Sequence, residues 1–294
     1  MTFLHRDDRI IIMDLEANRL TLDELKRIAD IGIQTTYYHE AINWQKMQPT
    51  EDSPIDFGRL DEYIENIQKV GMKTLLPFLH RLPTWKPDKW YFTREKEGIP
   101  SYGNPQVGDD LDEFAKQIIS RYDPQLFQLI YAIPGDGEFP CHFWPTAPDL
   151  PFPTRVLSDF VIERQRLLAQ QHGEVWTAYH CYTEPVWWDS FYTALRTAYP
   201  VSQFYGIAFT LYIHNQGRIY DWYRRTSERY NMGYFGGSEY CQGLAKHTPI
   251  CISQGHRGFI TAPIHPFQEH KRLESWMLED LMFANERLKE AANA

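Results

Sequence analysis

The sequence lacks three features that would direct the protein to a membrane or to a nucleic acid. It has no apolar run near the roughly 18 residues that a membrane-spanning helix needs. It has no basic excess, because 39 acidic residues outnumber 30 basic ones and the net charge is −9. A surface for nucleic acid or anionic lipid would need the opposite balance. The first nine residues are polar, so no secretory signal is indicated and a cytoplasmic location is predicted.

Cysteine is scarce, and the Cys-x-x-Cys spacing of a structural zinc site is absent. The two dipeptides Cys141-His142 and His180-Cys181 are the remaining candidates for metal ligands, if they meet in space. Reduced thiols packed among loops are the simpler interpretation. We therefore predict no metal and no cofactor. The sequence gives no indication of the oligomeric state. The cysteines are Cys141, Cys181, Cys241 and Cys251.

Aromatic residues are abundant, at 15% of the chain with nine tryptophans and eighteen tyrosines. Tryptophan and tyrosine rings stack on the C–H faces of sugars while their polar ends still form hydrogen bonds. Core packing accounts for most of the phenylalanines, but it explains poorly the pair Trp187-Trp188 and the cluster at Trp85 and Trp90. The composition therefore favours a carbohydrate ligand.

Apolar strand-like runs alternate along the chain with amphipathic helical stretches, which indicates a parallel sheet with helical crossovers. Thr21 and Glu24 form a capping box that begins a helix, and Gly32 ends it. No internal repeat or second core is visible. We predict an α/β fold, a single (β/α)8 TIM barrel domain over residues 1–294. The expected strands are 9–14, 34–39, 72–79, 127–133, 175–180, 205–212, 233–237, and either 250–252 or 258–262.

Further helices are expected from periodic apolar residues. One carries Phe57, Leu60, Ile64 and Ile67 and ends at Gly71. A second carries Leu111, Phe114, Ile118 and Ile119, and a third lies around residues 160–168. The last helix of the chain carries Leu273, Trp276, Met277 and Leu281. Residues 84–108 read as one long loop that walls a cleft with Trp85, Trp90 or Tyr91. The connection 240–248 is predicted to hold only one or two helical turns.

Two glutamates follow predicted strands in the manner that glycoside hydrolysis requires. Barrel active sites lie where strands end, and hydrolysis needs one carboxyl group on each side of the scissile bond. Glu138 follows strand four between glycines and Phe139, whose apolar ring favours a raised pKa and a general acid. Glu239 follows strand seven, and Tyr212 can donate a hydrogen bond that keeps it ionised. Solvated carboxylates are the ordinary alternative for any single glutamate.

Other polar and aromatic residues also lie just beyond predicted strands. Histidine hydrogen-bonds sugars well, although it packs equally well as a structural residue. Glu40 and Glu184 are weaker carboxylate candidates that would orient a ligand or form ion pairs. The predicted substrate-binding residues are His39, Glu40, Trp44, His80, Trp85, Asp136, His180, Trp187, Tyr212 and His214.

A set of motifs in the first third of the chain resembles the clan A glycoside hydrolases, most of all their β-galactosidase-type members. The resemblance implies a (β/α)8 barrel and a retaining mechanism, with an acid/base glutamate after strand four and a nucleophile after strand seven. Glu138 and Glu239 match these positions, and Tyr212 matches the strand-six tyrosine. The motifs are Ile42-Asn43-Trp44 through Pro49, Ile55-Asp56-Phe57, Leu60-Asp61, Gly71-Met72-Lys73 and Pro83-Thr84-Trp85.

One position departs from that clan. Clan members usually have an asparagine directly before the acid/base, where it holds the sugar 2-hydroxyl, whereas this chain has Gly137 preceded by Asp136. The resulting Gly-x-Gly-Glu resembles the β-amylase group, which inverts. We expect a glycoside hydrolase, retaining in mechanism, that cleaves an oligosaccharide or glycoside. The alternatives are an inverting glycosidase, a carbohydrate-binding barrel without turnover, and a metal-dependent isomerase or lyase acting on a sugar.

Overall fold

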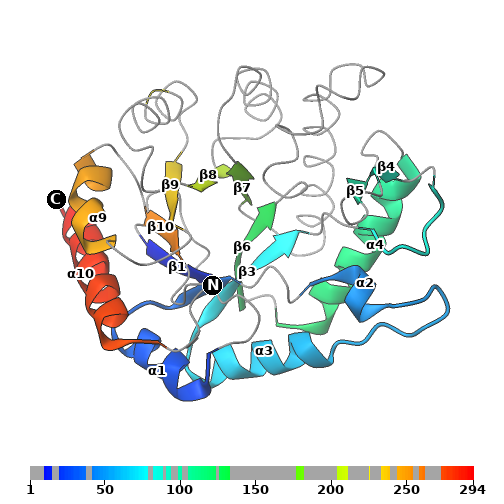
Figure 1. Cartoon of the computed structure of the whole chain (residues 1–294), viewed down its shortest axis with the longest axis horizontal. Helices are drawn as coiled ribbons and strands as arrows, with labels where there is room; N and C mark the ends of the chain where they lie inside the picture. Colours follow the sequence, from blue (N-terminus) through cyan, green and yellow to red (C-terminus); the bar gives the residue numbers. More distant parts are fainter. Residues whose placement is uncertain are drawn as a thin grey trace.

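Eight parallel strands form the centre of the protein (Figure 1). The computed structural model describes residues 10–14, 20–37, 42–78, 82–88, 91–93, 99–100, 105–123, 126–132, 177–181, 204–210, 225, 233–238, 244–253, 258–261 and 273–294. The strands pair in the closed order β1-β10-β9-β8-β7-β6-β3-β2. Their bounds are β1 Ile10–Asp14, β2 Thr35–Tyr37, β3 Lys73–Phe78, β6 Phe127–Ala132, β7 Thr177–Cys181, β8 Phe204–Thr210, β9 Gly233–Ser238 and β10 Gly258–Thr261. The parallel sheet predicted from the sequence is confirmed.

The first strand shows why these apolar runs become central strands. Ile11, Ile12 and Met13 are consecutive, and each is at most 2% exposed. Since neighbouring side chains of a strand point to opposite faces, both faces of β1 are covered. A parallel sheet covered on both faces favours such continuous apolar runs over alternating ones. The apolar run of β1 therefore has both of its faces in the core of the protein.

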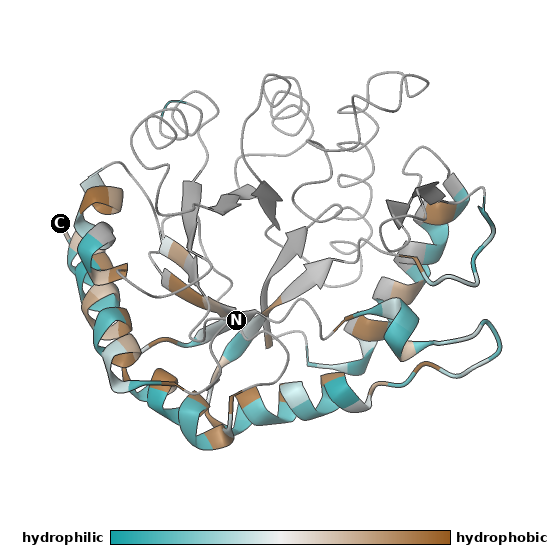
Figure 2. Ribbon diagram, viewed as in Figure 1, coloured by the Kyte–Doolittle hydropathy of each residue, from teal (hydrophilic) through white to brown (hydrophobic). Residues whose placement is uncertain are grey.

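Helices lie around the outside of the strands (Figure 1). Hydrophobic and hydrophilic residues interchange along α1, α3 and α10, as expected of helices with one covered face (Figure 2). In α3, the predicted residues Leu60, Ile64 and Ile67 are buried together with Tyr63, whereas Phe57 directly precedes the helix and is half-buried. The bounds are α1 Leu22–Asp30, α2 Trp44–Met47, α3 Gly58–Lys69, α4 Pro105–Arg121, α9 Leu244–Ser253 and α10 Ser275–Ala292.

The ends of the first and third helices agree with their sequence signals. The Thr21 hydroxyl accepts a hydrogen bond from the Glu24 N–H, and the Glu24 carboxylate accepts one from the Thr21 N–H, so the predicted capping box is confirmed. Gly32 and Gly71 follow α1 and α3 with φ of 84° and 73°. A side chain makes this left-handed conformation costly, which is why glycine ends both helices.

The first and last described helices are joined by polar contacts. The Glu24 carboxylate accepts a hydrogen bond from the Leu273 N–H at 3.0 Å. The amide of Asn285, which is 4% exposed, donates to the Ile31 carbonyl at 3.0 Å. Both contacts link residues about 250 positions apart in the chain, so they hold its two ends together across the seam where β1 pairs with β10.

A buried network of hydroxyl groups connects α3 to two strands. The Tyr63 hydroxyl lies 2.7 Å from Thr36 Oγ1 and 2.8 Å from Thr74 Oγ1. Thr36 and Thr74 are paired residues of β2 and β3, and all three side chains are at most 3% exposed. Buried polar groups are costly unless they are hydrogen-bonded, so this network fixes the position of α3 on the sheet.

Two expectations about the connections were wrong. Residues 84–108 are not one loop: Tyr91–Thr93 (β4) and Ile99–Pro100 (β5) form a two-stranded antiparallel sheet, and α4 already begins at Pro105. Proline is favoured at the first helical position because its missing N–H has no partner there anyway. The connection after β9 is also longer than expected, since α9 spans ten residues.

The ambiguity over the last strand is resolved in favour of β10, because the alternative run 250–252 lies inside α9. The helix contains Pro249, which would ordinarily argue against it. Its packing shows why it persists: Thr248 and Cys251 are at most 1% exposed, and the Thr248 hydroxyl donates to the Leu244 carbonyl at 2.7 Å. Among the helices that the structure describes, none could cross a membrane.

Candidate active site

The carboxyl ends of the eight strands meet at one edge of the closed sheet. Ser238 at the end of β9 is level with Thr261 at the end of β10, and Ala132 at the end of β6 is level with Phe78 at the end of β3. In the closed order β6 borders β3, whereas β9 and β3 stand on opposite sides of the ring. Active sites of parallel barrels lie at this edge, in the loops that follow the strands.

The two glutamates lie next to this edge in sequence. Glu239 is the residue directly after Ser238, the last of β9. Glu138 follows Ala132, the last of β6, by six positions. Both glutamates lie outside the described residues, as do most of the other predicted site residues: His39, Glu40, His80, Asp136, Trp187, Tyr212 and His214. The pairing of these residues in one cleft therefore stays a prediction.

Three of the predicted site residues fall in the part of the chain that the structure describes. The backbone of His180 lies in β7, next to the last residue of that strand, where it pairs with Ala208 of β8. Trp44 begins α2 in the connection after β2, and Trp85 lies in the connection after β3. Both tryptophans thus belong to loops at the carboxyl edge of the sheet, and they contact each other with ring centroids 5.9 Å apart.

Trp44 is the buried member of this pair. Its indole is 5% exposed and stacks on Phe114 of α4, with centroids 4.5 Å apart and planes 12° from parallel. Its Nε1–H donates to the side-chain oxygen of Gln48 at 2.8 Å. One face and the polar end of the ring are therefore occupied by the protein itself. Trp44 has a packing role in this structure, and its contact with a sugar stays a prediction.

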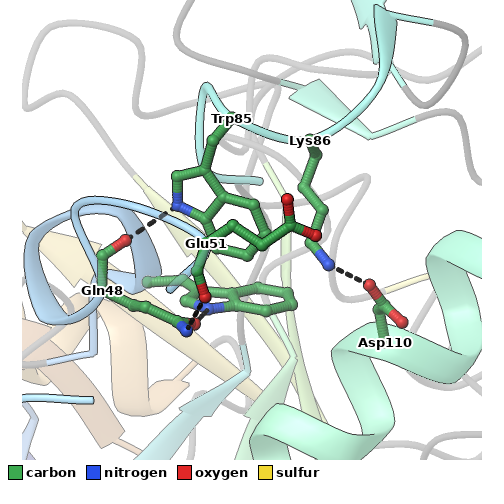
Figure 3. A network of polar contacts seen from close by, with 6 residues as sticks. Gln48, Glu51, Trp85, Lys86 and Asp110 are labelled. Carbon is green, nitrogen blue, oxygen red and sulfur yellow. Dashed lines mark hydrogen bonds and ion pairs between the residues drawn. The ribbon is translucent and has the colours of Figure 1, made fainter. Parts of the chain in front are cut away.

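Trp85 is half-buried, and hydrogen bonds tie its loop to the preceding one. Its Nε1–H donates to the backbone carbonyl of Gln48 at 2.9 Å (Figure 3). The hydroxyl of the neighbouring Thr84 donates to the side-chain oxygen of Gln45 at 2.9 Å. The Gln48 amide nitrogen donates in turn to the carbonyls of Glu51 and Ser53. The loops after β2 and β3 are thereby held as one unit.

Lys86 completes the cluster and was missed in the sequence. Its ammonium lies 4.6 Å from the centroid of the Trp85 ring and 5.0 Å from that of Trp44, and it forms an ion pair with Asp110 of α4 (Figure 3). The lysine side chain is only 12% exposed. The cluster consists of Trp44, Trp85, Lys86, Asp110 and Phe114. Since its members are up to 70 positions apart, no local spacing in the sequence reveals it.

Comparison with known sequences gives a partial match. No family model matches the chain. A β-galactosidase from Haloferax lucentense is 27% identical over 135 residues, which are 40% of this chain and 19% of that protein. The chain therefore aligns with about a fifth of the length of that relative.

Solved structures match most of the chain. An exo-β-1,4-mannosidase from Opitutaceae bacterium strain TAV5 matches with a TM-score of 0.68 at 13% identity, over 99% of this chain and 63% of that one. The catalytic domain of a β-amylase from Paenibacillus polymyxa matches with a TM-score of 0.59 at 11% identity, over 88% and 92%. A family 1 β-glucosidase from Thermotoga maritima matches with a TM-score of 0.54 at 8% identity, over 92% and 86%. At such identities the likeness concerns the fold alone.

Proposed function

We propose that the chain forms a single (β/α)8 barrel domain that hydrolyses glycosidic bonds with Glu138 and Glu239. The observation that carries the proposal is the closed parallel sheet, in which β6 and β9 end at the same edge and lead into these two glutamates. Glycosidases among the structural neighbours, and a β-galactosidase among the relatives, support a carbohydrate substrate. Neither nucleic acid nor membrane is part of the proposed function.

The proposed mechanism is a double displacement that retains the anomeric configuration. The Glu239 carboxylate attacks the anomeric carbon while the Glu138 carboxylic acid protonates the departing oxygen, so that one C–O bond forms as another breaks. Glu138, now ionised, then removes a proton from water, which attacks the glycosyl-enzyme and releases Glu239. The side chains that would hold the sugar are the aromatic, histidine and carboxylate residues predicted at the strand ends.

An inverting mechanism is the second candidate. It is favoured by Gly137, which stands where clan A enzymes have asparagine, and by the likeness to a β-amylase domain. In that mechanism one carboxylate activates water directly, and the two carboxyl groups stand about 6.5–9.5 Å apart instead of about 5–5.5 Å. Proton NMR of the first product formed distinguishes the two mechanisms, because a retaining enzyme releases the anomer of the substrate and an inverting one the opposite anomer.

The experiment that tests the function begins with a screen of aryl β-galactosides, β-mannosides and β-glucosides together with starch-type oligosaccharides. On the substrate found, Glu239→Gln should abolish turnover while the far-UV CD spectrum stays unchanged, because an amide cannot attack the anomeric carbon. Glu62→Gln, an exposed carboxylate of α3, is the matched control and should remain fully active. Wild-type rates in Glu239→Gln would refute the proposed role.

Glu138→Ala separates the two roles. It should slow hydrolysis of natural oligosaccharides far more than that of activated aryl glycosides, whose leaving groups need little protonation. Azide should restore its turnover by attacking the glycosyl-enzyme, and the glycosyl azide should keep the configuration of the substrate. Equal losses with both kinds of leaving group would contradict the acid/base assignment.

Two further candidates are tested alongside. A barrel that binds carbohydrate without turnover would show sugar binding by calorimetry and no product with any glycoside. A metal-dependent isomerase or lyase would lose its activity in EDTA, whereas the proposed hydrolase should keep it.

A further inference from the structure

We propose that Lys86 is a positioning residue that holds Trp85 as the platform for the leaving-group sugar, so that the natural substrates are glycosides whose leaving group is itself a sugar. This inference rests on the proposed function and names the substrate class of the same site. The observations behind it are the order of the strands, the contacts of the Trp85 ring and the burial of the lysine.

The strand order indicates which side of the site the Trp85 loop borders. A general acid protonates the leaving oxygen, so the leaving group lies on the acid's side of the scissile bond. Glu138, the proposed acid, follows β6, which borders β3 in the ring. Trp85 lies in the connection after β3, while the proposed nucleophile follows β9 on the opposite side. A leaving group beside Glu138 is therefore on the side of the Trp85 loop.

Trp85 has the features of a fixed platform for a sugar. The residue is half-buried in the connection after β3, so the protein does not enclose it fully. The hydrogen bond from its Nε1–H to Gln48, at 2.9 Å, fixes the rotation of the ring. The Trp85 ring also makes an edge contact with the buried Trp44, with the two ring planes at 88° to each other. A ring held in this way stacks on a sugar without losing rotational freedom at the moment of binding.

Lys86 is the residue that ties this platform to the barrel wall. Its ammonium is attracted to both indole rings, and Asp110 of α4 neutralises it. An ordinary surface lysine would keep its charge in water, whereas this side chain is only 12% exposed. Removing the charge leaves Asp110 without that partner and releases the Trp85 loop from α4. The effect should fall on the binding of the leaving-group sugar, not on the carboxylates.

The test compares two substrates that share the sugar identified by the glycoside screen. One is the corresponding disaccharide, and the other is the glycosyl fluoride, whose leaving group has no ring to stack. Lys86→Met, which keeps most of the length of the side chain without its charge, should lower kcat/KM for the disaccharide by about tenfold, mainly through KM. The fluoride should keep its wild-type kcat/KM. Lys86→Arg, which preserves the charge and the stacking, should recover most of the loss.

Control and readout separate positioning from general destabilisation. Lys116→Met removes a lysine of α4 whose ion pair with Glu113 is exposed, and it should change neither substrate. Hydrogen exchange measured by mass spectrometry should rise in residues 82–88 of Lys86→Met and stay unchanged in α3. This readout needs no substrate.

The possible outcomes have distinct meanings. Equal losses on disaccharide and fluoride, or unchanged kinetics on both, overturn the inference while leaving the proposed hydrolase intact. Unchanged exchange in residues 82–88 of the Lys86→Met variant also overturns it. A wild-type protein that hydrolyses no glycoside refutes the proposed function instead. A loss confined to the disaccharide, with faster exchange in the loop and recovery in Lys86→Arg, supports the inference.

Discussion

The hydroxyl of Tyr63 gives the sharpest stability prediction, because its two threonine partners and their burial are described. The hydroxyl bridges Thr36 of β2 and Thr74 of β3 at 2.7 and 2.8 Å, and Tyr63 is only 3% exposed. Tyr63→Phe removes only the hydroxyl oxygen. The change should therefore destabilise the protein without altering its fold or the proposed active site.

The magnitude follows from the contacts that remain. Each threonine hydroxyl also lies within hydrogen-bonding distance of a backbone carbonyl: Thr36 Oγ1 is 2.9 Å from the Lys73 oxygen, and Thr74 Oγ1 is 2.9 Å from the Leu75 oxygen. Neither threonine is left without an acceptor, so the cost is that of one or two net hydrogen bonds, about 1–2 kcal/mol. Tyr63→Ala, which also removes the ring, should cost about 3–5 kcal/mol because a cavity is added.

The measurement is urea unfolding followed by tryptophan fluorescence and by far-UV CD, with free energies taken where the two transitions coincide. Thr74→Val and the double variant complete a mutant cycle, whose coupling energy should reach about 0.5 kcal/mol or more if the two side chains interact as described. A Tyr63→Phe variant as stable as wild type, with no coupling to Thr74→Val, would refute the reasoning.

The remaining predictions concern a charged pair and two glycines. The hydrogen bond from Arg121 holds the pKa of Asp61 below its usual range, with a further contribution from the Tyr122 hydroxyl. A carboxyl group whose pKa is lowered by folding stabilises the protein at pH values above its pKa in the unfolded chain. The free energy of unfolding of wild type should therefore exceed that of Asp61→Asn by its full amount at pH 7, and this difference should disappear as the pH falls below about 4. Unfolding at several pH values can check this, and a difference that does not change with pH would contradict it. Gly71→Ala should cost about 1–2 kcal/mol from backbone strain alone, since no atom lies within 4 Å of the added carbon. Gly32→Ala should cost a similar amount from its φ of +84°, because the atom nearest the added carbon is the ammonium of the flexible Lys289 side chain, at 2.7 Å, which can move away. A calorimetric Tm above that of wild type in either variant would contradict the assignment of strain.

Local signals in the sequence determined most of the secondary structure that the structure describes. The strand ranges, the capping box at Thr21 and Glu24, and the glycines that end α1 and α3 depend on residues close together in the chain. Periodicity and capping act over one or two turns, so they can be recognised without knowledge of the partners. Two segments are exceptions. Residues 84–108 were expected to form one loop, but they contain β4, β5 and the start of α4. The run 250–252, one of the two alternatives for the last strand, lies inside α9, where Thr248 and Cys251 are buried.

The positions of Glu138 and Glu239 after strands four and seven were also readable from the sequence, because barrel chemistry is tied to strand ends. What only the tertiary structure decided is the side-chain environment around that edge. Tryptophan is a residue type that often stacks on sugars, yet Phe114 covers one face of the Trp44 ring. Lys86 carries no motif, yet its ammonium lies within 5.0 Å of two indole centroids. The physical reason is range: backbone preference is set by near neighbours, whereas the exposure and partners of a side chain depend on segments that only folding brings together.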